Sequence, residues 1–212
     1  MKPPSPRPLM RTDKKKLRTR QALIDAGYHV MAKHGIDAAT MHQIADKADV
    51  AAGTIYNYFS SKDDLAMCVM EEVMERLARR IEAATANFDD PAQVYAFGIR
   101  SVIEAAIYDK RLRLLLRRVE VICDAMYRKF GPSAIPDIAE AVTAGRFDVQ
   151  DPALAWRMAA HAITGFSLGV CDNQVDPKMI DEAVVNLLGM VGLDRKTAWE
   201  IALRPCPPLP KE

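Results

Sequence analysis

Residues 40–62, TMHQIADKADVAAGTIYNYFSSK, constrain the fold more than any other stretch of the chain. Thr40 has the chemistry of a helix N-cap, because its hydroxyl can accept from a free backbone N–H at the start of a helix over residues 41–48. Residues 49–52 then form a turn, and Gly53 opens a further helix. The stretch therefore predicts two short helices separated by a turn.

These two short helices have an inward and an outward face. Apolar residues three or four positions apart lie on one side of a helix and predict contact with a core. The inward residues are Met41, Ile44, Ala45, Ala48, Ile55 and Phe59. The outward residues of the second helix carry hydroxyl, amide and aromatic groups, and they are Thr54, Tyr56, Asn57 and Tyr58.

Longer amphipathic helices are predicted on both sides of this stretch. One covers residues 14–34 and ends at Gly35, which accepts the left-handed backbone conformation common at helix C-termini. Another runs from Lys62 to about Asn87 with apolar residues at a regular four-residue step. The remaining predicted helices cover residues 91–108, 111–130, 136–145, 152–171, 177–191 and 194–203.

No strand pattern occurs, so the predicted fold class is all-α. We expect a three-helix head, residues 14–65, joined by the long helix to a helical body, residues 66–204. Residues 1–13 are predicted to be a disordered basic arm, and the proline-rich residues 205–212 a disordered tail. Gly131 and Pro132 are expected to end the helix that precedes them.

The net charge of +1 conceals an asymmetry along the chain. Up to Leu65 there are 11 basic and 7 acidic residues, and beyond it 18 basic and 21 acidic ones, so the first part carries about +4 and the second about −3. Eight of the first 20 residues are basic, against Asp13 alone. A basic patch of this kind indicates a nucleic-acid binder, although a solvated tail has the same composition.

Several classes of function and location receive no support. The four cysteines are too far apart for a zinc pair and too few for a disulfide scaffold, which favours a reducing cytoplasm. No apolar run reaches the roughly 20 residues of a membrane span. Nucleotide-binding, nucleophile and metal-binding motifs are missing, and the four histidines do not cluster. We therefore predict no catalytic residues, no metal and no cofactor.

The pattern T-x-x-x-I-A-x-x-A-x-V-A-x-G-T-x-Y-x-Y-F-x-x-K-x-x-L, from Thr40 to Leu65, resembles the DNA-binding head of the tetracycline-repressor (TetR) family of bacterial transcriptional regulators. The resemblance is residue-specific from about Arg18 to Leu65 and covers only helix order beyond that. Asp49 departs from the pattern, because the family usually has glycine there. Aspartate also tolerates left-handed backbone angles, so we expect the turn to form.

The resemblance implies a helix-turn-helix that binds double-stranded DNA. Phosphate contacts are implied for Thr40, Tyr58 and Lys62, because hydroxyl and ammonium groups position a duplex. Small, amide and aromatic side chains can approach base edges and thymine methyls. The groove-facing residues implied in this way are Ala51, Ala52, Gly53, Thr54, Tyr56 and Asn57. Packing between helices is the alternative for both tyrosines.

A single helix-turn-helix contacts few base pairs, so specificity requires two heads on a two-fold symmetric operator. The helices over residues 152–171 and 177–191 resemble the dimerisation helices of the family. Together with their copies they would form a four-helix bundle. The predicted homodimer interface consists of Ala162, Gly165, Gly169, Ile180, Ala183, Val184, Leu187, Leu188 and Val191.

The resemblance also implies a cavity for a small-molecule effector in the body. Aromatic, methionine and sparse polar side chains suit such a cavity, although each can instead fill a core. Arg100 can pair with Glu104 on the surface or line the cavity, and His161 can be an ordinary core histidine. The ligand-binding candidates are Tyr95, Phe97, Arg100, Met126, Tyr127, Trp156, His161 and Phe166.

The sequence therefore predicts a homodimeric repressor that a small hydrophobic or amphipathic ligand releases from a palindromic operator. A ligand-independent regulator and a thiol-based redox sensor remain alternatives. The redox sensor requires a reactive thiol at Cys68, Cys123 or Cys171, all at apolar helical positions. A helical enzyme would be indicated by turnover of a small molecule.

Overall fold

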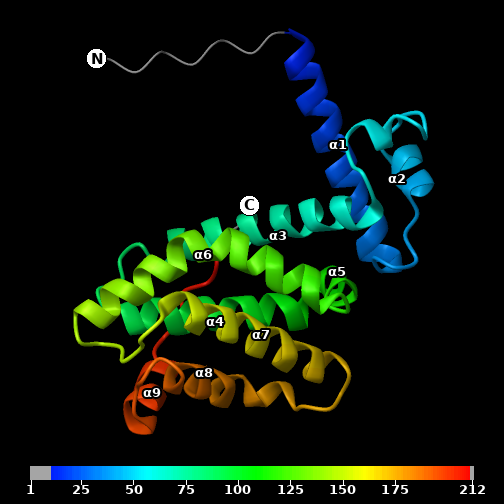
Figure 1. The fold of residues 1–212 in the computed structure, drawn as a ribbon. Helices are drawn as coiled ribbons and strands as arrows, with labels where there is room; N and C mark the ends of the chain where they lie inside the picture. The colour runs from blue at the N-terminus through cyan, green and yellow to red at the C-terminus, as the bar shows by residue number, and fades with distance from the viewer. Residues whose placement is uncertain (1–10, 211–212) are drawn as a thin grey trace, which may run out of the picture. The chain divides into compact units, whose positions relative to one another are not determined.

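The structure is a computed structural model that describes residues 11–210, so most of the predicted basic arm lies outside the described residues. The described chain consists of α-helices and short 3₁₀ turns without a strand, which confirms the all-α prediction (Figure 1). It divides into two compact units within one helix, between Val69 and Met70. No described helix is long and apolar enough to cross a bilayer.

The first unit contains α1 (Arg11–His34), α2 (Met41–Lys47), the 3₁₀ turn η1 (Ile55–Asn57) and the start of α3 (Lys62–Thr85). Helix α1 begins three residues earlier than predicted, so residues 11–13 are helical rather than disordered. Apolar side chains from all four elements form one buried core. This core includes Leu23, Ile24, Met31, Ile44, Ile55, Phe59 and Leu65.

The turn after α2 forms as predicted despite the aspartate. Asp49 has a positive φ of 56°. Its N–H donates to the carbonyl of Asp46 at 3.1 Å, and the N–H of Val50 donates to the carbonyl of Ala45 at 3.0 Å. These two bonds form a Schellman motif, which satisfies the last carbonyls of the helix.

The predicted helix from Gly53 is only a 3₁₀ turn. Backbone N–H groups in this segment bond three residues back: Thr54 to Ala51 at 2.7 Å, Asn57 to Thr54 at 3.1 Å and Tyr58 to Ile55 at 3.0 Å. Glycine favours irregular backbone over helix, and α3 begins soon after at Lys62. The chain therefore has little length in which to build an α-helix.

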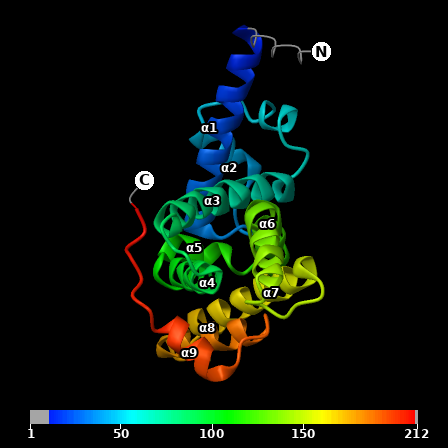
Figure 2. The same cartoon turned by 90° about the vertical axis from the view of Figure 1, so that its left-hand side faces the viewer.

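In the second unit, α4 (Pro91–Tyr108) contacts all the helices that follow it. Asp90 caps it by accepting from the N–H of Ala92 at 3.0 Å, and Pro91 occupies the first turn as predicted. Figure 2 shows α8 and α9 together on one side of α4 and α7. The other helices are α5 (Lys110–Leu115), α6 (Val119–Thr143), α7 (Pro152–Cys171), α8 (Ile180–Gly189) and α9 (Arg195–Ala202), with the 3₁₀ turn η2 (Pro177–Met179) before α8.

Helix α6 corrects two predictions. The segment 111–130 is interrupted after α5, and α6 then continues through Gly131, Pro132 and Pro136 to Thr143. Each proline removes one backbone donor, which normally ends a helix. Here tertiary packing outweighs that loss, because Phe130, Gly131, Ile138 and Ala141 are buried along the same helix.

The segment that follows α9 is held at two places. Arg204 donates to Oδ2 of Asp90 at 2.7 Å, and Arg80 donates to the carbonyl of Pro210 at 2.7 Å. Burial would raise the pKa of Asp90, but hydrogen bonds from Arg146 and Arg204 outweigh it and lower the pKa to about 2. Residues 205–210, for which disorder stays a prediction, contain no helix or strand.

Gly192, after α8, approaches another segment of backbone closely. Its φ is +94°, and a Cβ there would lie 2.7 Å from Cβ and 2.8 Å from N of Asp148. The N–H of Asp148 donates to the carbonyl of Val191 at 3.0 Å. No side chain fits at position 192 without moving this backbone.

We expect Gly192→Ala to lower the free energy of unfolding by about 2–3 kcal/mol, because it adds a left-handed alanine and a backbone clash. The measurement is urea denaturation at fixed protein concentration. Gly189→Ala is the matched control, since no atom lies within 4 Å of a Cβ at this helical glycine. An equal loss in both variants would contradict the packing argument.

Candidate nucleic-acid interface and internal cavity

The outward surface of the first unit is built on two buried anchors. Ile55 and Phe59 are 0% and 1% exposed, as their four-residue spacing predicts. The chain around them consequently turns its other side chains outward. Ala51, Ala52, Gly53, Tyr56 and Asn57 are exposed, whereas Thr54 and Tyr58 are half-buried.

The two tyrosines differ in exposure. Tyr56 is 60% exposed, so it is available to a partner and the packing alternative is wrong for it. Tyr58 is half-buried, which suits both packing and a phosphate contact through its hydroxyl. Tyr56 and Asn57 thus present an aromatic ring and an amide side by side on an exposed turn.

Thr40 caps α2 and Lys62 begins α3, and each retains donors for a phosphate. Thr40 Oγ1 accepts from the N–H of Gln43 at 3.2 Å, and Gln43 Oε1 accepts from the N–H of Thr40 at 3.0 Å. This capping box confirms the predicted N-cap and leaves the O–H of Thr40 free to donate. Lys62 Nζ donates to the carbonyl of Asp37 at 2.5 Å, and an ammonium has two further donors.

Arg20 has a structural role that the sequence did not indicate. Its Nη2 lies 3.1 Å from Sγ of Cys68, and its guanidinium lies 5.3 Å from the ring centroid of Phe59. Arg20, which is exposed, therefore links α1 to α3 within the first unit. The two residues are 48 positions apart, so no local pattern reveals the contact.

The second unit contains a cavity of about 600 Å³ between α3, α4, α6 and α7, which is open on one side. Its walls are mainly apolar, which is typical of small-molecule sites. Helix α3 contributes Ala78, Ile81, Glu82 and Thr85. The other helices contribute, among others, Tyr95, Ile99, Val102, Phe130, Asp137, Ile138, Trp156 and Ile163.

Two polar atoms of the cavity walls lack partners. The hydroxyl of Tyr95 and Nε1 of Trp156 are both buried and accept or donate no hydrogen bond within the described chain. Leaving such a group unpaired costs about 1–3 kcal/mol. Burial also raises the pKa of Tyr95, so its hydroxyl stays protonated and can donate.

Four carboxylates and no basic side chain belong to the cavity lining. They are exposed and come from Glu82, Asp89, Asp137 and Glu140. Desolvation raises the pKa of Asp137, and the charges of Glu140 and Glu82 raise it further. The open side of the cavity is therefore acidic.

The structure brings only Tyr95 and Trp156 of the eight ligand candidates to this cavity. Arg100 lies outside the cavity and pairs with Glu104 at 3.9 Å, which is one of the two alternatives given above. It also pairs with Asp181 and donates to the carbonyl of Ala202 at 3.0 Å, so it joins α4 to α8 and α9. His161 is exposed on α7, with Nδ1 at 2.8 Å from the carbonyl of Arg157. The other candidates also lie elsewhere: Phe97 against Phe88, Tyr127 under Arg157, Met126 in the core beside Thr164, and Phe166 half-buried on α7.

The predicted dimer interface needs a similar correction. Helix α8 directs its apolar face into its own subunit, where it packs against α4, α7 and α9. Five predicted interface residues are therefore buried within the subunit: Ile180, Val184, Leu187, Leu188 and Val191. Ala183 is half-buried, and Gly169 is needed within the chain because a Cβ there would lie 2.9 Å from Val175.

Helix α7 exposes an apolar stripe, of which only Ala162 and Gly165 were predicted. Leu154 and Met158 are 55% and 53% exposed. The predicted residues Ala162 and Gly165 continue the same face and are also exposed. The i, i+4 spacing from Leu154 could have indicated this stripe, but α7 is apolar around most of its circumference.

Two of the three cysteines considered for a redox role, Cys123 and Cys171, lie where burial disfavours the thiolate. Burial raises the pKa of both Cys123 and Cys171, which keeps these thiols protonated and poorly nucleophilic. No set of metal-ligating side chains occurs within residues 11–210.

Sequence comparison identifies both parts of the chain. Residues 23–67 match the family described as bacterial regulatory proteins of the tetR family. Residues 90–204, more than half of the chain, match the tetracyclin repressor-like C-terminal domain. The transcriptional repressor KstR of Mycolicibacterium smegmatis is 30% identical over 106 residues, which are 50% of this chain and 52% of that protein. The chain thus aligns with about half the length of this relative.

KstR of Rhodococcus jostii is 27% identical over 180 residues, 85% of this chain and 72% of that repressor. The crystal structure of RolR with resorcinol superposes with a TM-score of 0.84 at 26% identity, covering 93% of this chain and 99% of RolR. The fatty acid degradation regulator FadR of Bacillus halodurans shares the fold, with a TM-score of 0.62, 23% identity, and 80% and 94% coverage. The chain belongs to the TetR family of transcriptional regulators, and its helix-turn-helix is a DNA-binding head.

Proposed function

We propose that this protein is a homodimeric repressor that binds a palindromic operator and leaves it when a small uncharged or amphipathic molecule occupies the cavity of the second unit. The observation that carries the proposal is the continuity of α3. Its first residues belong to the DNA-binding unit, and Ala78, Ile81, Glu82 and Thr85 of the same helix line the cavity.

Two kinds of DNA contact are proposed for the head. Thr40, Tyr58 and Lys62 hold phosphates, because each offers a hydroxyl or ammonium donor beside the exposed turn. Ala51, Ala52, Gly53, Thr54, Tyr56 and Asn57 face the groove. The exposure of Tyr56 and Asn57 supports this division, since base contacts require side chains that project beyond the backbone.

We expect Lys62→Ala to weaken binding to all duplexes and to lower the slope of log Kd against log salt by about one unit per head, as loss of one phosphate contact predicts. Asn57→Ala is the matched comparison, and it should change discrimination among operator variants while preserving the slope. The measurement is fluorescence anisotropy across a salt series. Lys62→Gln keeps a hydrogen-bond donor for the carbonyl of Asp37, so it separates the loss of charge from misfolding. An unchanged salt slope in both Lys62 variants would contradict the phosphate contact.

The proposed dimer forms through the exposed stripe of α7. Leu154, Met158, Ala162 and Gly165 offer large apolar side chains at one end and small residues at the other, where a second helix can approach closely. Apolar side chains exposed in a row on one helix usually mark an interaction surface. A second copy of α7 in antiparallel orientation would place small residues opposite large ones.

Met158→Asp should shift the protein from dimer to monomer, because a carboxylate at the centre of an apolar interface is desolvated without a partner. Sedimentation equilibrium would measure the shift, which we expect to raise the dimer dissociation constant at least about 100-fold. Leu203→Asp is the control, since Leu203 is 64% exposed and lies outside α7. Equal effects of the two substitutions would place the interface elsewhere.

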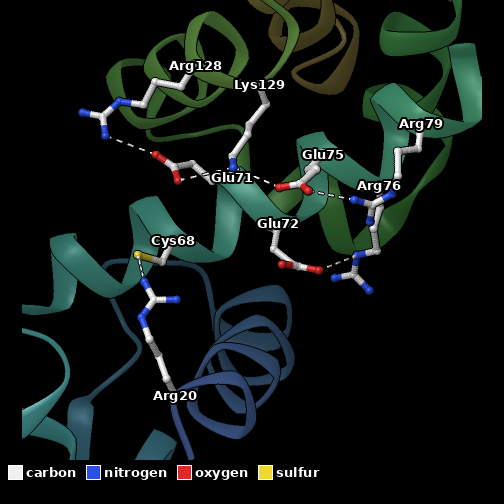
Figure 3. A network of polar contacts seen from close by, with 9 residues as sticks. All are labelled: Arg20, Cys68, Glu71, Glu72, Glu75, Arg76, Arg79, Arg128 and Lys129. Carbon is white, nitrogen blue, oxygen red and sulfur yellow. Dashed lines mark hydrogen bonds and ion pairs between the residues drawn. The ribbon is translucent and has the colours of Figure 1, made fainter. Parts of the chain in front are cut away.

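The proposed coupling runs through α3 and α6, which line the cavity together. Figure 3 shows the ion pairs that join them: Arg128 to Glu71 at 3.2 Å and Lys129 to Glu75 at 2.9 Å. A ligand that separates the two helices therefore acts on α3 close to the DNA-binding unit. The ligand shifts the equilibrium only by its difference in affinity between the two states.

The direct test is a gel-shift scan of the DNA upstream of the protein's own gene, repeated with a panel of small hydrophobic compounds. Resorcinol belongs in the panel because the similar RolR was crystallised with it. We expect specific retardation of one fragment and its loss with at least one compound. Failure to bind any duplex specifically would refute the proposal, and binding that no compound reverses would favour a ligand-independent regulator.

A further inference from the structure

The chemistry of the cavity lining restricts the class of ligand more than the cavity volume alone does. The cavity walls are mainly apolar, Tyr95 and Trp156 carry the lining polar atoms that lack a partner within the described chain, and the charged lining residues are all carboxylates. Side chains of this chain provide both the apolar walls and the carboxylates. The inference drawn from them rests on the proposed function, in which this cavity is the effector site.

The unpartnered polar atoms indicate what the ligand must supply. Nε1 of Trp156 can only donate, so it requires an acceptor. The hydroxyl of Tyr95 is protonated and can donate or accept. Trp156 is 4% exposed, so bulk water does not pair with its Nε1 in this structure. A ligand oxygen that reaches either atom supplies the missing partner.

The carboxylates indicate what the ligand must lack. Glu82, Asp89, Asp137 and Glu140 contribute negative charge, and no lysine, arginine or histidine lines the cavity to balance it. Burial raises the pKa of Asp137, and the neighbouring charges of Glu140 and Glu82 raise it further. A carboxylate or phosphate on the ligand would add to this repulsion.

The walls also favour a compact shape. Aromatic rings from Phe88, Tyr95, Phe130, Phe147 and Trp156 surround a volume of about 600 Å³. Flat ring systems pack against such walls with offset or edge contacts.

We propose that the cavity binds an uncharged, compact ring compound whose hydroxyl or carbonyl oxygen hydrogen-bonds with Trp156 Nε1 and the Tyr95 hydroxyl, and that it rejects acidic ligands of the same size. Tyr95 and Trp156 anchor the oxygen inside the cavity. The four carboxylates at the open side exclude anions.

Matched compounds test this chemistry on the full-length protein. Three pairs differ in ring size and share the same contrast: phenol and benzoate, 2-naphthol and 2-naphthoate, 4-phenylphenol and biphenyl-4-carboxylate. Isothermal titration calorimetry should show that at least one hydroxyl compound binds, and at least about tenfold more tightly than its carboxylate partner. Binding that favours the carboxylate, or no binding by any hydroxyl compound, would overturn the proposal.

Two substitutions test the anchors. Tyr95→Phe and Trp156→Phe should each lower the affinity for the hydroxyl compound by about five- to tenfold, because each removes one buried hydrogen bond. The affinity for the parent hydrocarbon should change much less. Trp199→Phe is the control, because Trp199 lies on α9 outside the cavity lining. If the hydroxyl compound keeps its advantage over the hydrocarbon in both cavity variants, the assigned anchors are wrong.

Gel shifts with the same compounds separate this inference from the proposed function. A hydroxyl compound that binds with the expected preferences but leaves the DNA complex intact would support the site chemistry and refute ligand release. A carboxylate that releases the protein from DNA, when the hydroxyl compounds do not, would support ligand release and refute the chemistry assigned here.

Discussion

Helix α3 is a single run of backbone hydrogen bonds that supplies buried residues to two separate cores. Leu65 and Val69 are buried in the first unit, where a Cβ on Gly27 would already lie 3.1 Å from Val69. Leu77 and Ile81 are buried in the second unit. In the proposed function, α3 is the element through which a displacement near the cavity would reach the DNA-binding unit. The cavity walls and the ion pairs with α6 acquire their proposed role from this continuity.

The cavity depends on α6, a helix whose two internal prolines disfavour helical structure. Pro132 and Pro136 each remove a backbone hydrogen bond from α6, yet the helix continues because its buried residues pack against α7. Phe130, for example, lies 6.2 Å from Trp156 between ring centroids. The same helix contributes Phe130 and Asp137 to the cavity. Buried polar atoms without partners add a further cost, and such local costs concentrate at functional sites.

The candidate sites differed in how far they could be predicted. Residues of the head were predictable because their roles follow from local chemistry: Thr40 caps a helix, and Ile55 and Phe59 share a face. Ligand candidates in the body were chosen by residue type, and only Tyr95 and Trp156 line the cavity. Aromatic and methionine side chains fill cores as well as cavities, so residue type alone does not separate the two.

The sequence by itself determined the all-helical class, the capped start of α2 and the turn at Asp49, because each depends on interactions within a few residues. Only the tertiary structure decided that α8 buries its apolar face within its own subunit, that α7 exposes Leu154 and Met158, and that Arg100 pairs with Asp181. Apolar periodicity shows that a helix face is covered but not what covers it. That choice depends on contacts between residues far apart in the chain, which no local pattern encodes.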